Sequence, residues 1–239
     1  MILSFHPCIG ADRQIVLGDR GVDRQVLTLI REAEAAILPQ GCPEALFWAC
    51  RRYSLTFPDY EKRYLFPGKC GQHRLFQLFR IPHPETISWE DVDTFVRSCG
   101  TGNLPHVLPF FLKGNLGHEA SCIFFVEDYL SLGRAMADLE DREGAGQRGF
   151  ITQAYVPCQG KVLRAVIVGG QTLTYWKRPA KAGEVITTIG RGAIIDEDWA
   201  PDLQEQGKRM AQSLAAATGI NLAALDLVFP LSQREPEPL

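Results

Sequence analysis

The sequence predicts an α/β (α+β) protein in which a small domain with a parallel sheet precedes a larger part made of two differently constructed halves. Three observations lead to this prediction. Short apolar runs alternate with a helical pattern before residue 67, as is typical of parallel sheets. A strand, a glycine-containing loop and another strand follow between residues 109 and 128. From residue 150 onward, strand-like segments succeed one another with a hairpin signal between them.

The composition favours a soluble, cytoplasmic protein. With 46% hydrophobic and 22% charged residues, the chain of 239 residues can bury a core. A net charge of -3 gives no broad attraction to nucleic acid or to an anionic membrane, so neither is expected as a partner. The seven cysteines are widely spaced and contain no C-x-x-C pair, which indicates reduced thiols. We find no basic leader before a long apolar region, and no apolar run approaches the roughly 18 residues that span a bilayer.

The first 67 residues predict a small α/β domain. Apolar runs at 2–5, 14–18 and 35–39 predict strands. Between the last two runs, apolar residues recur at the spacing of one helix face. They are Val22, Val26, Leu29, Ile30 and Ala33.

The next segment, to residue 149, alternates helices and strands. A helix carrying Leu75, Leu78 and Phe79 ends at the proline-rich 81–86, and Ser88 with Asp91 predicts a capping box for a helix that runs to Cys99. Strands are predicted at 109–113 and 121–128. Asp128 can cap the helix that follows, which the glycine-rich 141–149 closes.

From residue 150 the pattern predicts an antiparallel sheet. Its strands are expected at 150–157, 161–168, 171–178 and 184–188, with the glycine pair 169–170 as a hairpin turn. A long helix containing Leu203, Met210, Leu214 and Ala217 should then stop at Gly219. The segment 221–230 predicts a buried strand.

A lysine at the end of an apolar strand is the first of three features that point to a nucleotide. Lys113 leads into GNLGHEAS, where Gly114, Gly117 and Ser121 would let backbone N–H groups approach an anion closely. Such a loop could fold over phosphates. In the alternative interpretation this is a hairpin whose glycines serve only the turn.

The second feature is the strand 150–157, which runs into a proline-marked linker between the two halves. Backbone groups near Gln153, Tyr155 and Val156 could bind a purine edge at this junction. An ordinary strand and turn is the alternative.

The third feature is a set of cations on the predicted sheet: Arg164, Lys177, Arg178 and Arg191. A strand fixes the direction of an arginine fork, which fits phosphate or carboxylate oxygens. Arg164 is the most informative because its neighbours are nearly all apolar. The alternative is a solvated sheet face with a snorkelling arginine.

Asp226 supplies a carboxylate on an apolar strand. A lone buried carboxylate is costly unless it is paired or binds metal. Mg²⁺ suits such a site, because proteins usually hold it with one or two carboxylates and substrate phosphates. A structural ion pair with one of the arginines is the competing explanation.

In this order the motifs resemble the ATP-grasp superfamily, particularly its ribosomal-protein glutamate-ligase-like and D-alanine ligase-like members. The resemblance implies a pre-ATP-grasp domain over residues 1–67 and an ATP-grasp domain over 68–239, with a small lobe at about 109–156 and an antiparallel-sheet lobe at about 157–239. Lys69 stands at the family's first ATP lysine and Lys113 at its second. By the same resemblance GNLGHEAS is the phosphate-covering loop and QAYV the adenine hinge.

The resemblance further implies a role for each charged residue. KVLRAVIVGG matches the strand that carries Arg164, and Lys177, Arg178 and Arg191 match phosphate or substrate cations. Asp226 matches the first magnesium carboxylate. Lys69 and Lys113 would hold ATP, while Arg164 and Arg191 would stabilise the transferring phosphoryl group or the carboxylate.

Four departures from the family pattern predict altered ribose and adenine contacts. Ala154 replaces the hinge acid, Val162 replaces the acid before Arg164, the loop has fewer glycines, and Thr188 stands where Asn is common. The family's Glu-x-Asn metal ligands would lie beyond Leu239. We therefore expect either a native chain that continues with these ligands or a metal-poor relative.

The function that the resemblance implies is ATP-dependent ligation with Mg²⁺. The γ-phosphoryl group of ATP would pass to a small-molecule or peptide carboxylate, and an amine or a similar nucleophile would attack the acylphosphate. Two alternatives remain open, a small-molecule kinase on the same fold and a non-catalytic nucleotide-binding module. A Rossmann oxidoreductase is set aside because no G-x-G-x-x-G follows the first strand.

Overall fold

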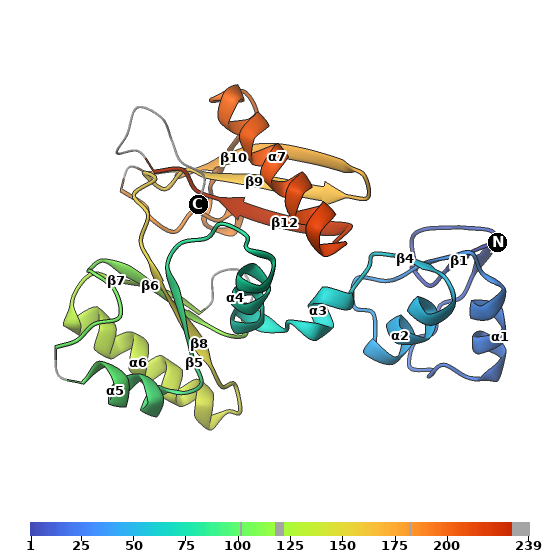
Figure 1. Cartoon of the computed structure of the whole chain (residues 1–239), viewed down its shortest axis with the longest axis horizontal. Helices are drawn as coiled ribbons and strands as arrows, with labels where there is room; N and C mark the ends of the chain where they lie inside the picture. The colour runs from blue at the N-terminus through green and yellow to red at the C-terminus, as the bar shows by residue number, and fades with distance from the viewer. Residues whose placement is uncertain (101, 118–121, 182, 231–239) are drawn as a thin grey trace.

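Three four-stranded sheets organise the chain in a computed structural model that describes residues 1–100, 102–117, 122–181 and 183–230. The N-terminal sheet lies at one end of the molecule (Figure 1). At the other end, the middle sheet and the C-terminal sheet lie one above the other beside helix α4 (Gly68–Phe79). This arrangement confirms the predicted α/β class with parallel and antiparallel sheets.

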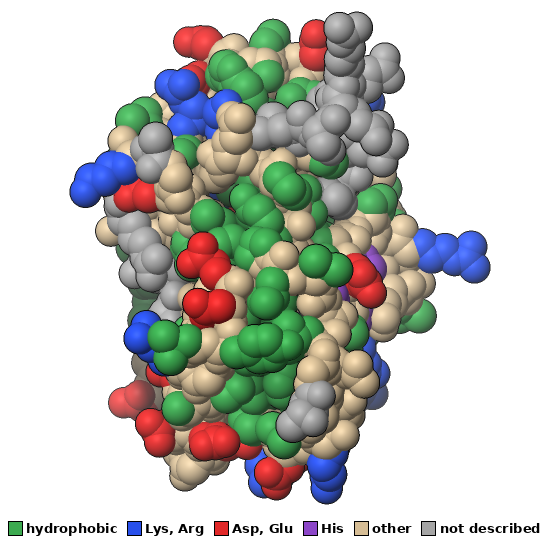
Figure 2. All heavy atoms as spheres, turned by 90° about the vertical axis from the view of Figure 1, so that its left-hand side faces the viewer, with side chains coloured by type: hydrophobic (Ala, Val, Ile, Leu, Met, Phe, Trp, Pro, Cys, Tyr) green, Lys and Arg blue, Asp and Glu red, His purple; other side chains and the backbone are tan. Residues whose placement is uncertain are grey.

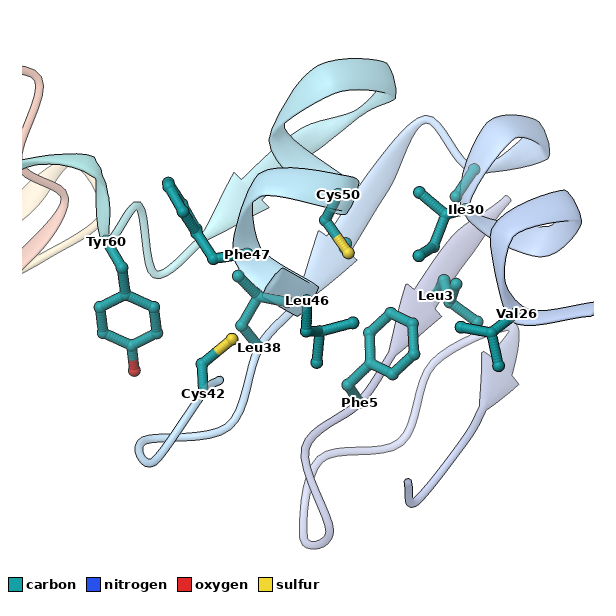
Figure 3. Packing of buried hydrophobic residues seen from close by; sticks show 12 residues of the cluster. Leu3, Phe5, Val26, Ile30, Leu38, Cys42, Leu46, Phe47, Cys50 and Tyr60 are labelled. Atoms are coloured by element: carbon teal, nitrogen blue, oxygen red, sulfur yellow. The ribbon is translucent and has the colours of Figure 1, made fainter. Parts of the chain in front are cut away.

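The N-terminal sheet is parallel throughout, as predicted. In spatial order its strands are β2 (Arg13–Gln14), β1 (Ile2–Ser4), β3 (Ala35–Ile37) and β4 (Leu55–Phe57). Helix α1 (Arg24–Glu32) begins where the Asp23 side chain accepts a hydrogen bond from the Val26 N–H. Helix α2 (Glu44–Tyr53), which the sequence analysis did not predict, packs Leu46 and Phe47 into the same core (Figure 3).

The middle sheet is antiparallel and has one covered face. In spatial order its strands are β5 (Thr86–Trp89), β8 (Phe150–Ala154), β6 (Phe110–Gly114) and β7 (Ile123–Val126). Its core contains Phe110 and Leu112 together with residues of α5 (Val92–Cys99) and α6 (Tyr129–Gly144). Because side chains alternate along a strand, Phe111 and Lys113 belong to the opposite face.

The C-terminal sheet is also antiparallel and is covered by α7 (Pro201–Thr218). In spatial order its strands are β11 (Ile194–Asp196), β10 (Gln171–Arg178), β9 (Val162–Val168) and β12 (Leu222–Leu227). Leu163, Ala165 and Ile167 of β9 are buried in the core beneath α7. Arg164 therefore lies on the opposite face. The predicted turn at 169–170 joins β9 to β10.

α3 (Glu61–Leu65) links the N-terminal sheet to α4. A short 3-10 helix, η1 (Ile189–Arg191), precedes β11. Among the described residues, no helix has both the length and the apolar character needed to cross a membrane.

Three local predictions were wrong. Residues 184–188 form no strand, because the Thr187 hydroxyl donates to the Gly160 carbonyl at 2.6 Å and this tertiary contact overrides β propensity. Ser88 lies within β5 and is not a cap, whereas Asp91 alone caps α5 through the Thr94 N–H. The last strand is only half buried, because β12 alternates exposed and covered residues at the sheet edge.

Candidate functional site

A cavity of about 1400 Å³ includes residues of the uncovered faces of both the middle and the C-terminal sheet in its wall. Helices α4 and α7 and the segments 155–158 and 185–190 complete that wall. Within the described part, Asp226 is the single carboxylate of the wall. The wall contains several cations, namely Lys69, Arg80, Lys113, Arg164, Lys177 and Arg209. This excess of positive charge favours a ligand with several negative charges.

Lys113 is the most unusual of these cations. Its Nζ donates to Gln153 Oε1 at 2.6 Å and lies 5.3 Å from the centre of the Phe111 ring. Burial and, to a smaller extent, the charge of Lys69 lower the pKa of Lys113 to about 8, although the charge of Asp226 opposes both effects. Lys113 forms no salt bridge with any described residue. An incoming phosphate would therefore supply the negative charge that this ammonium group lacks.

The Gln153 amide is held in place from its other end. Gln153 Nε2 donates to Thr86 Oγ1 at 2.9 Å, and the Thr86 hydroxyl donates to the Pro84 carbonyl at 2.7 Å. This chain leaves Oε1 to face Lys113. The residue that the sequence analysis assigned to a purine edge thus also fixes the ammonium group of Lys113.

Lys69 lies in the first turn of α4 and lines the same cavity. Burial lowers the pKa of Lys69. Because the charge of Lys69 lowers the pKa of Lys113, the two ammonium groups are near enough to repel each other. The structure thus brings together the two lysines that the sequence analysis matched to ATP.

Arg164, Lys177 and Asp226 form a charged cluster on the uncovered face of the C-terminal sheet. Arg164 donates from Nε and Nη2 to the two Asp226 oxygens, each at 2.9 Å, and Lys177 Nζ donates to the same carboxylate at 2.9 Å. Burial alone would raise the pKa of Asp226, but these two cations outweigh it and lower that pKa. The hydrogen bond from Arg164 to Asp226 raises the pKa of Arg164, whereas burial lowers the pKa of Lys177.

This cluster bears on the metal prediction. It contains an ion pair between Asp226 and an arginine, which the sequence analysis gave as the alternative to a metal site. Among the described residues, no three His, Cys, Asp or Glu side chains are grouped so as to hold a metal ion. The protein groups described at this site thus offer Mg²⁺ one carboxylate that already has two cationic partners, and the metal role of Asp226 stays a prediction.

An apolar surface lies beside the lysines. Phe111, Ile123 and Ile151 of the middle sheet and Tyr155 and Val156 after β8 line the cavity. Figure 2, which views the left-hand side of Figure 1, shows hydrophobic side chains gathered along the vertical midline of that face, with acidic and basic side chains on either side. An aromatic base can pack against such side chains while Gln153 supplies a polar contact.

Other predicted site residues lie elsewhere. Arg178 forms a salt bridge with Asp196, with 2.9 Å between Nη2 and Oδ2, and is absent from the cavity wall as described. Gly114 and Gly117 also lie outside that wall. Ser121 falls outside the described residues, as does the side chain of Arg191, whose backbone ends η1.

The cavity wall also contains residues that the sequence analysis missed. Arg80 and Arg209 add positive charge near α4 and α7. Arg80 has a left-handed backbone with φ of 54° at the end of α4, where glycine is the usual residue. The signal in the sequence that could have marked Arg80 is its position directly after the helical pattern, where a helix ends. Arg209 has none, because a lysine or arginine on an exposed helix face is commonplace.

Comparisons with known proteins identify relatives in sequence and solved structures of similar fold. No family model matches the sequence. The chain is 24% identical over 214 residues to tetrahydromethanopterin:α-L-glutamate ligase of Methanosarcina acetivorans, covering 84% of this chain and 56% of that protein. It is 23% identical over 150 residues to human β-citrylglutamate synthase B, covering 62% of this chain and 36% of that protein. The chain thus spans about half the length of the first of these relatives and about a third of the second.

Solved structures of ATP-grasp proteins have the same architecture. A RimK domain ATP-grasp protein from Sphaerobacter thermophilus aligns with a TM-score of 0.58 at 17% identity, covering 87% of this chain and 72% of the other. D-cycloserine synthetase aligns with a TM-score of 0.58 at 14% identity, covering 100% and 90%. An ADP complex of N5-carboxyaminoimidazole ribonucleotide synthetase aligns with a TM-score of 0.64 at 12% identity, covering 99% and 61%. The chain therefore has the ATP-grasp fold that its motifs predict.

Proposed function

We propose that this chain binds ATP in the cavity between the middle and C-terminal sheets and uses it to join a carboxylate to an amine. The observation that carries the proposal is Lys113, whose ammonium group lacks a carboxylate partner among the described residues and has Lys69 nearby. A cation held in this way gains stabilisation when a phosphate arrives.

The residues of the cavity fit ATP. Its base would pack against Phe111 and Ile151, and Gln153 would offer hydrogen bonds to the base edge. Its phosphates would lie at Lys69 and Lys113. The wall could also accommodate Mg²⁺, with Asp226 as its one described carboxylate; bound there, the ion would neutralise phosphate charge.

The proposed reaction requires positioning and positive charge more than covalent participation by the protein. A carboxylate oxygen of the first substrate takes the γ-phosphoryl group and forms an acylphosphate. The amine attacks its carbonyl carbon, and inorganic phosphate leaves with the carboxylate oxygen. Arg164, with its guanidinium fixed on β9, would stabilise the charge that develops on these oxygens, and we assign Arg191 the same role.

The substrates that we propose are acidic. The names of the relatives in sequence share glutamate, joined to a tetrahydromethanopterin or citryl group. Arg80 and Arg209 add cations to the wall that the proposed triphosphate contacts do not use. We therefore propose glutamate, or a similar amino acid, as the amine. The seven unpaired cysteines are consistent with a cytoplasmic setting.

Calorimetry tests ATP binding. Lys113→Ala should weaken the binding of ATP, or of a non-hydrolysable analogue, by at least tenfold, about 1.4 kcal/mol. Lys208→Ala on α7 is the matched control, because Lys208 lies outside the cavity wall as described. Equal losses in the two variants, or no binding by the unaltered protein, would refute a nucleotide site here.

Oxygen labelling tests the chemistry. The protein is given ATP, Mg²⁺, L-glutamate and ¹⁸O-carboxylate-labelled citrate or N-acetylaspartate. Ligation transfers one ¹⁸O atom to inorganic phosphate, whereas a kinase forms a phosphoester and releases no phosphate. Binding of ATP without turnover of any probe would favour the non-catalytic alternative.

A further inference from the structure

Asn115, two residues after Lys113, is hydrogen-bonded to the helix that carries Lys69. The Asn115 carbonyl accepts from the Lys69 N–H at 3.0 Å, and Asn115 Oδ1 accepts from the Cys70 N–H at 3.0 Å. The Asn115 N–H in turn donates to the Gly149 carbonyl at 2.9 Å. One residue at the end of β6 therefore contacts both the start of α4 and the segment before β8.

These bonds replace a cap that α4 lacks. The first N–H groups of a helix have no partner within the helix. The residue in the capping position of α4 is Pro67, whose side chain makes no capping hydrogen bond. Asn115 satisfies two of these N–H groups, those of Lys69 and Cys70, although it is far from α4 in the sequence.

Gly68 permits this close approach. A Cβ atom added at Gly68 would lie 2.2 Å from Asn115 Oδ1 and 2.9 Å from its carbonyl oxygen. The φ angle of Gly68 is +69°, which also favours glycine. Glycine at position 68 thus leaves the space that the Asn115 side chain and carbonyl occupy.

The two lysines connected in this way repel each other. Lys69 and Lys113 line the same cavity, and the charge of Lys69 lowers the pKa of Lys113, so keeping both ammonium groups there works against their repulsion. We propose that Asn115 is a positioning residue that caps α4 from outside and thereby holds Lys69 beside Lys113 for a shared phosphate ligand. The shared ligand rests on the proposed function, whereas the positioning of the two ammonium groups does not.

The first test measures the ammonium groups without nucleotide. Lysines are dimethylated with ¹³C, and the Lys113 signal, assigned with Lys113→Arg, is titrated by NMR. Asn115→Ala removes the side-chain acceptor of the Cys70 N–H, so the start of α4 should shift, Lys69 should move away from Lys113, and the Lys113 pKa should rise toward its ordinary value. Asn103→Ala is the matched control, since Asn103 is exposed in a loop, and it should leave the titration unchanged.

The second test is a double-mutant cycle on ATP binding. Asn115→Ala should weaken the binding of ATP about tenfold, which corresponds to about 1.4 kcal/mol. When added to Lys69→Ala, the same substitution should cost less than about twofold, because its effect passes through Lys69. A merely structural role would give equal losses in both backgrounds.

Gly68→Ala provides an independent check, because the added methyl group displaces the Asn115 side chain. It should reproduce the rise in the Lys113 pKa even if Asn115→Ala fails to fold. An unchanged Lys113 titration in either folded variant would overturn the proposal. A changed titration in a protein that does not bind ATP would support the positioning role and refute the proposed function.

Discussion

Arg164 on β9 and Asp226 on β12 occupy paired positions of the antiparallel ladder and are joined by two hydrogen bonds of 2.9 Å. A guanidinium group held at both ends of its fork has a fixed plane. Lys177 adds a third hydrogen bond to the same carboxylate with a side chain that is only 3% exposed. Asp226 is therefore the internal counter-ion that lets two cations face a cavity together.

We predict that Asp226→Asn destabilises the fold. The substitution leaves Arg164 and Lys177 without their common carboxylate, and a cation deprived of its partner costs free energy. Asp226 is 45% exposed, so solvent screening reduces this cost, and we expect a loss of about 1–2 kcal/mol in urea unfolding. Asp198→Asn, at an exposed position before α7, should change stability by less than about 0.5 kcal/mol.

The same substitution separates the two roles considered for Asp226. As a counter-ion alone, its loss leaves the cations free and should strengthen the binding of ATP measured without Mg²⁺. As a metal ligand, its loss should weaken the additional affinity that Mg²⁺ confers. Calorimetry with and without Mg²⁺ gives both values, and no change in either would contradict both roles.

The second prediction concerns pH and Lys113. ATP affinity should fall as pH rises through about 8, because the free protein then loses the Lys113 proton that phosphate binding requires. Between pH 7 and pH 9 we expect a loss of about tenfold. Lys113→Arg, which stays charged, should flatten this dependence in calorimetric titrations. A slope that persists unchanged in the arginine variant would assign the titration to another group.

The effect of Lys113 on stability should have the opposite sign. Its pKa is lower in the folded protein than its ordinary value of 10.5, so the unfolded chain binds more protons between about pH 8 and 10.5. Over that range Lys113 makes the folded protein more stable as pH rises. Chemical unfolding of the parent and Lys113→Arg at pH 8 and pH 10 measures this difference.

Local patterns in the sequence predicted several residues of the cavity wall but few of the contacts between them. Lys69, Lys113, Arg164 and Asp226 each follow from a short motif. Alternation along β6 and β9 explains why the side chains of Lys113 and Arg164 reach the uncovered faces. Pairing of Arg164 with Asp226 depends on strand register across 62 residues, which composition does not encode. The domain boundary expected at residues 67 and 68 stays a prediction.

Contacts between distant segments explain what the sequence did not predict. The cap that Asn115 provides for α4 comes from 45 residues away, so no capping motif marks it. Residues 184–188 have strong β propensity, but a hydroxyl contact to Gly160 ties them to a loop instead. Tertiary contacts therefore determine both how α4 is capped and why residues 184–188 form no strand.

Arg80 leads to a third prediction, a trade between stability and binding. Its left-handed φ of 54° disfavours a residue with a side chain, so Arg80→Gly should stabilise the fold by about 0.5–1 kcal/mol. The same change removes a cation from the cavity wall and should raise the KM for an acidic substrate more than it changes KM for ATP. Thermal unfolding and steady-state kinetics measure the two effects. A stabilised variant with unaltered kinetics would exclude Arg80 from substrate binding.

Asn221 leads to a fourth prediction, on the contact between the N-terminal sheet and β12. Its Oδ1 accepts from the Asp59 N–H at 2.7 Å, and its Nδ2 donates to the Thr56 carbonyl at 3.1 Å. Asn221→Ala should cost about 1–2 kcal/mol and speed amide exchange at Asp59. Asn103→Ala is again the matched control. Unchanged exchange at Asp59 would show that other contacts hold this junction.

The last prediction compares two helical glycines. Gly207 of α7 faces the core, where an added Cβ would lie 2.3 Å from Leu163 Cδ2 and 3.0 Å from Leu227 Cδ1, whereas an added Cβ at Gly133 of α6 meets nothing within 4 Å. Alanine improves helix propensity at both positions by about 1 kcal/mol. At Gly207 overpacking of the core costs about 1–3 kcal/mol, which exceeds that gain. Gly133→Ala should therefore stabilise the protein and Gly207→Ala should destabilise it, as measured by urea unfolding. Stabilisation by both substitutions would mean that α7 can shift away from the C-terminal sheet, and that sheet would then be a less rigid support for Arg164 than its buried core indicates.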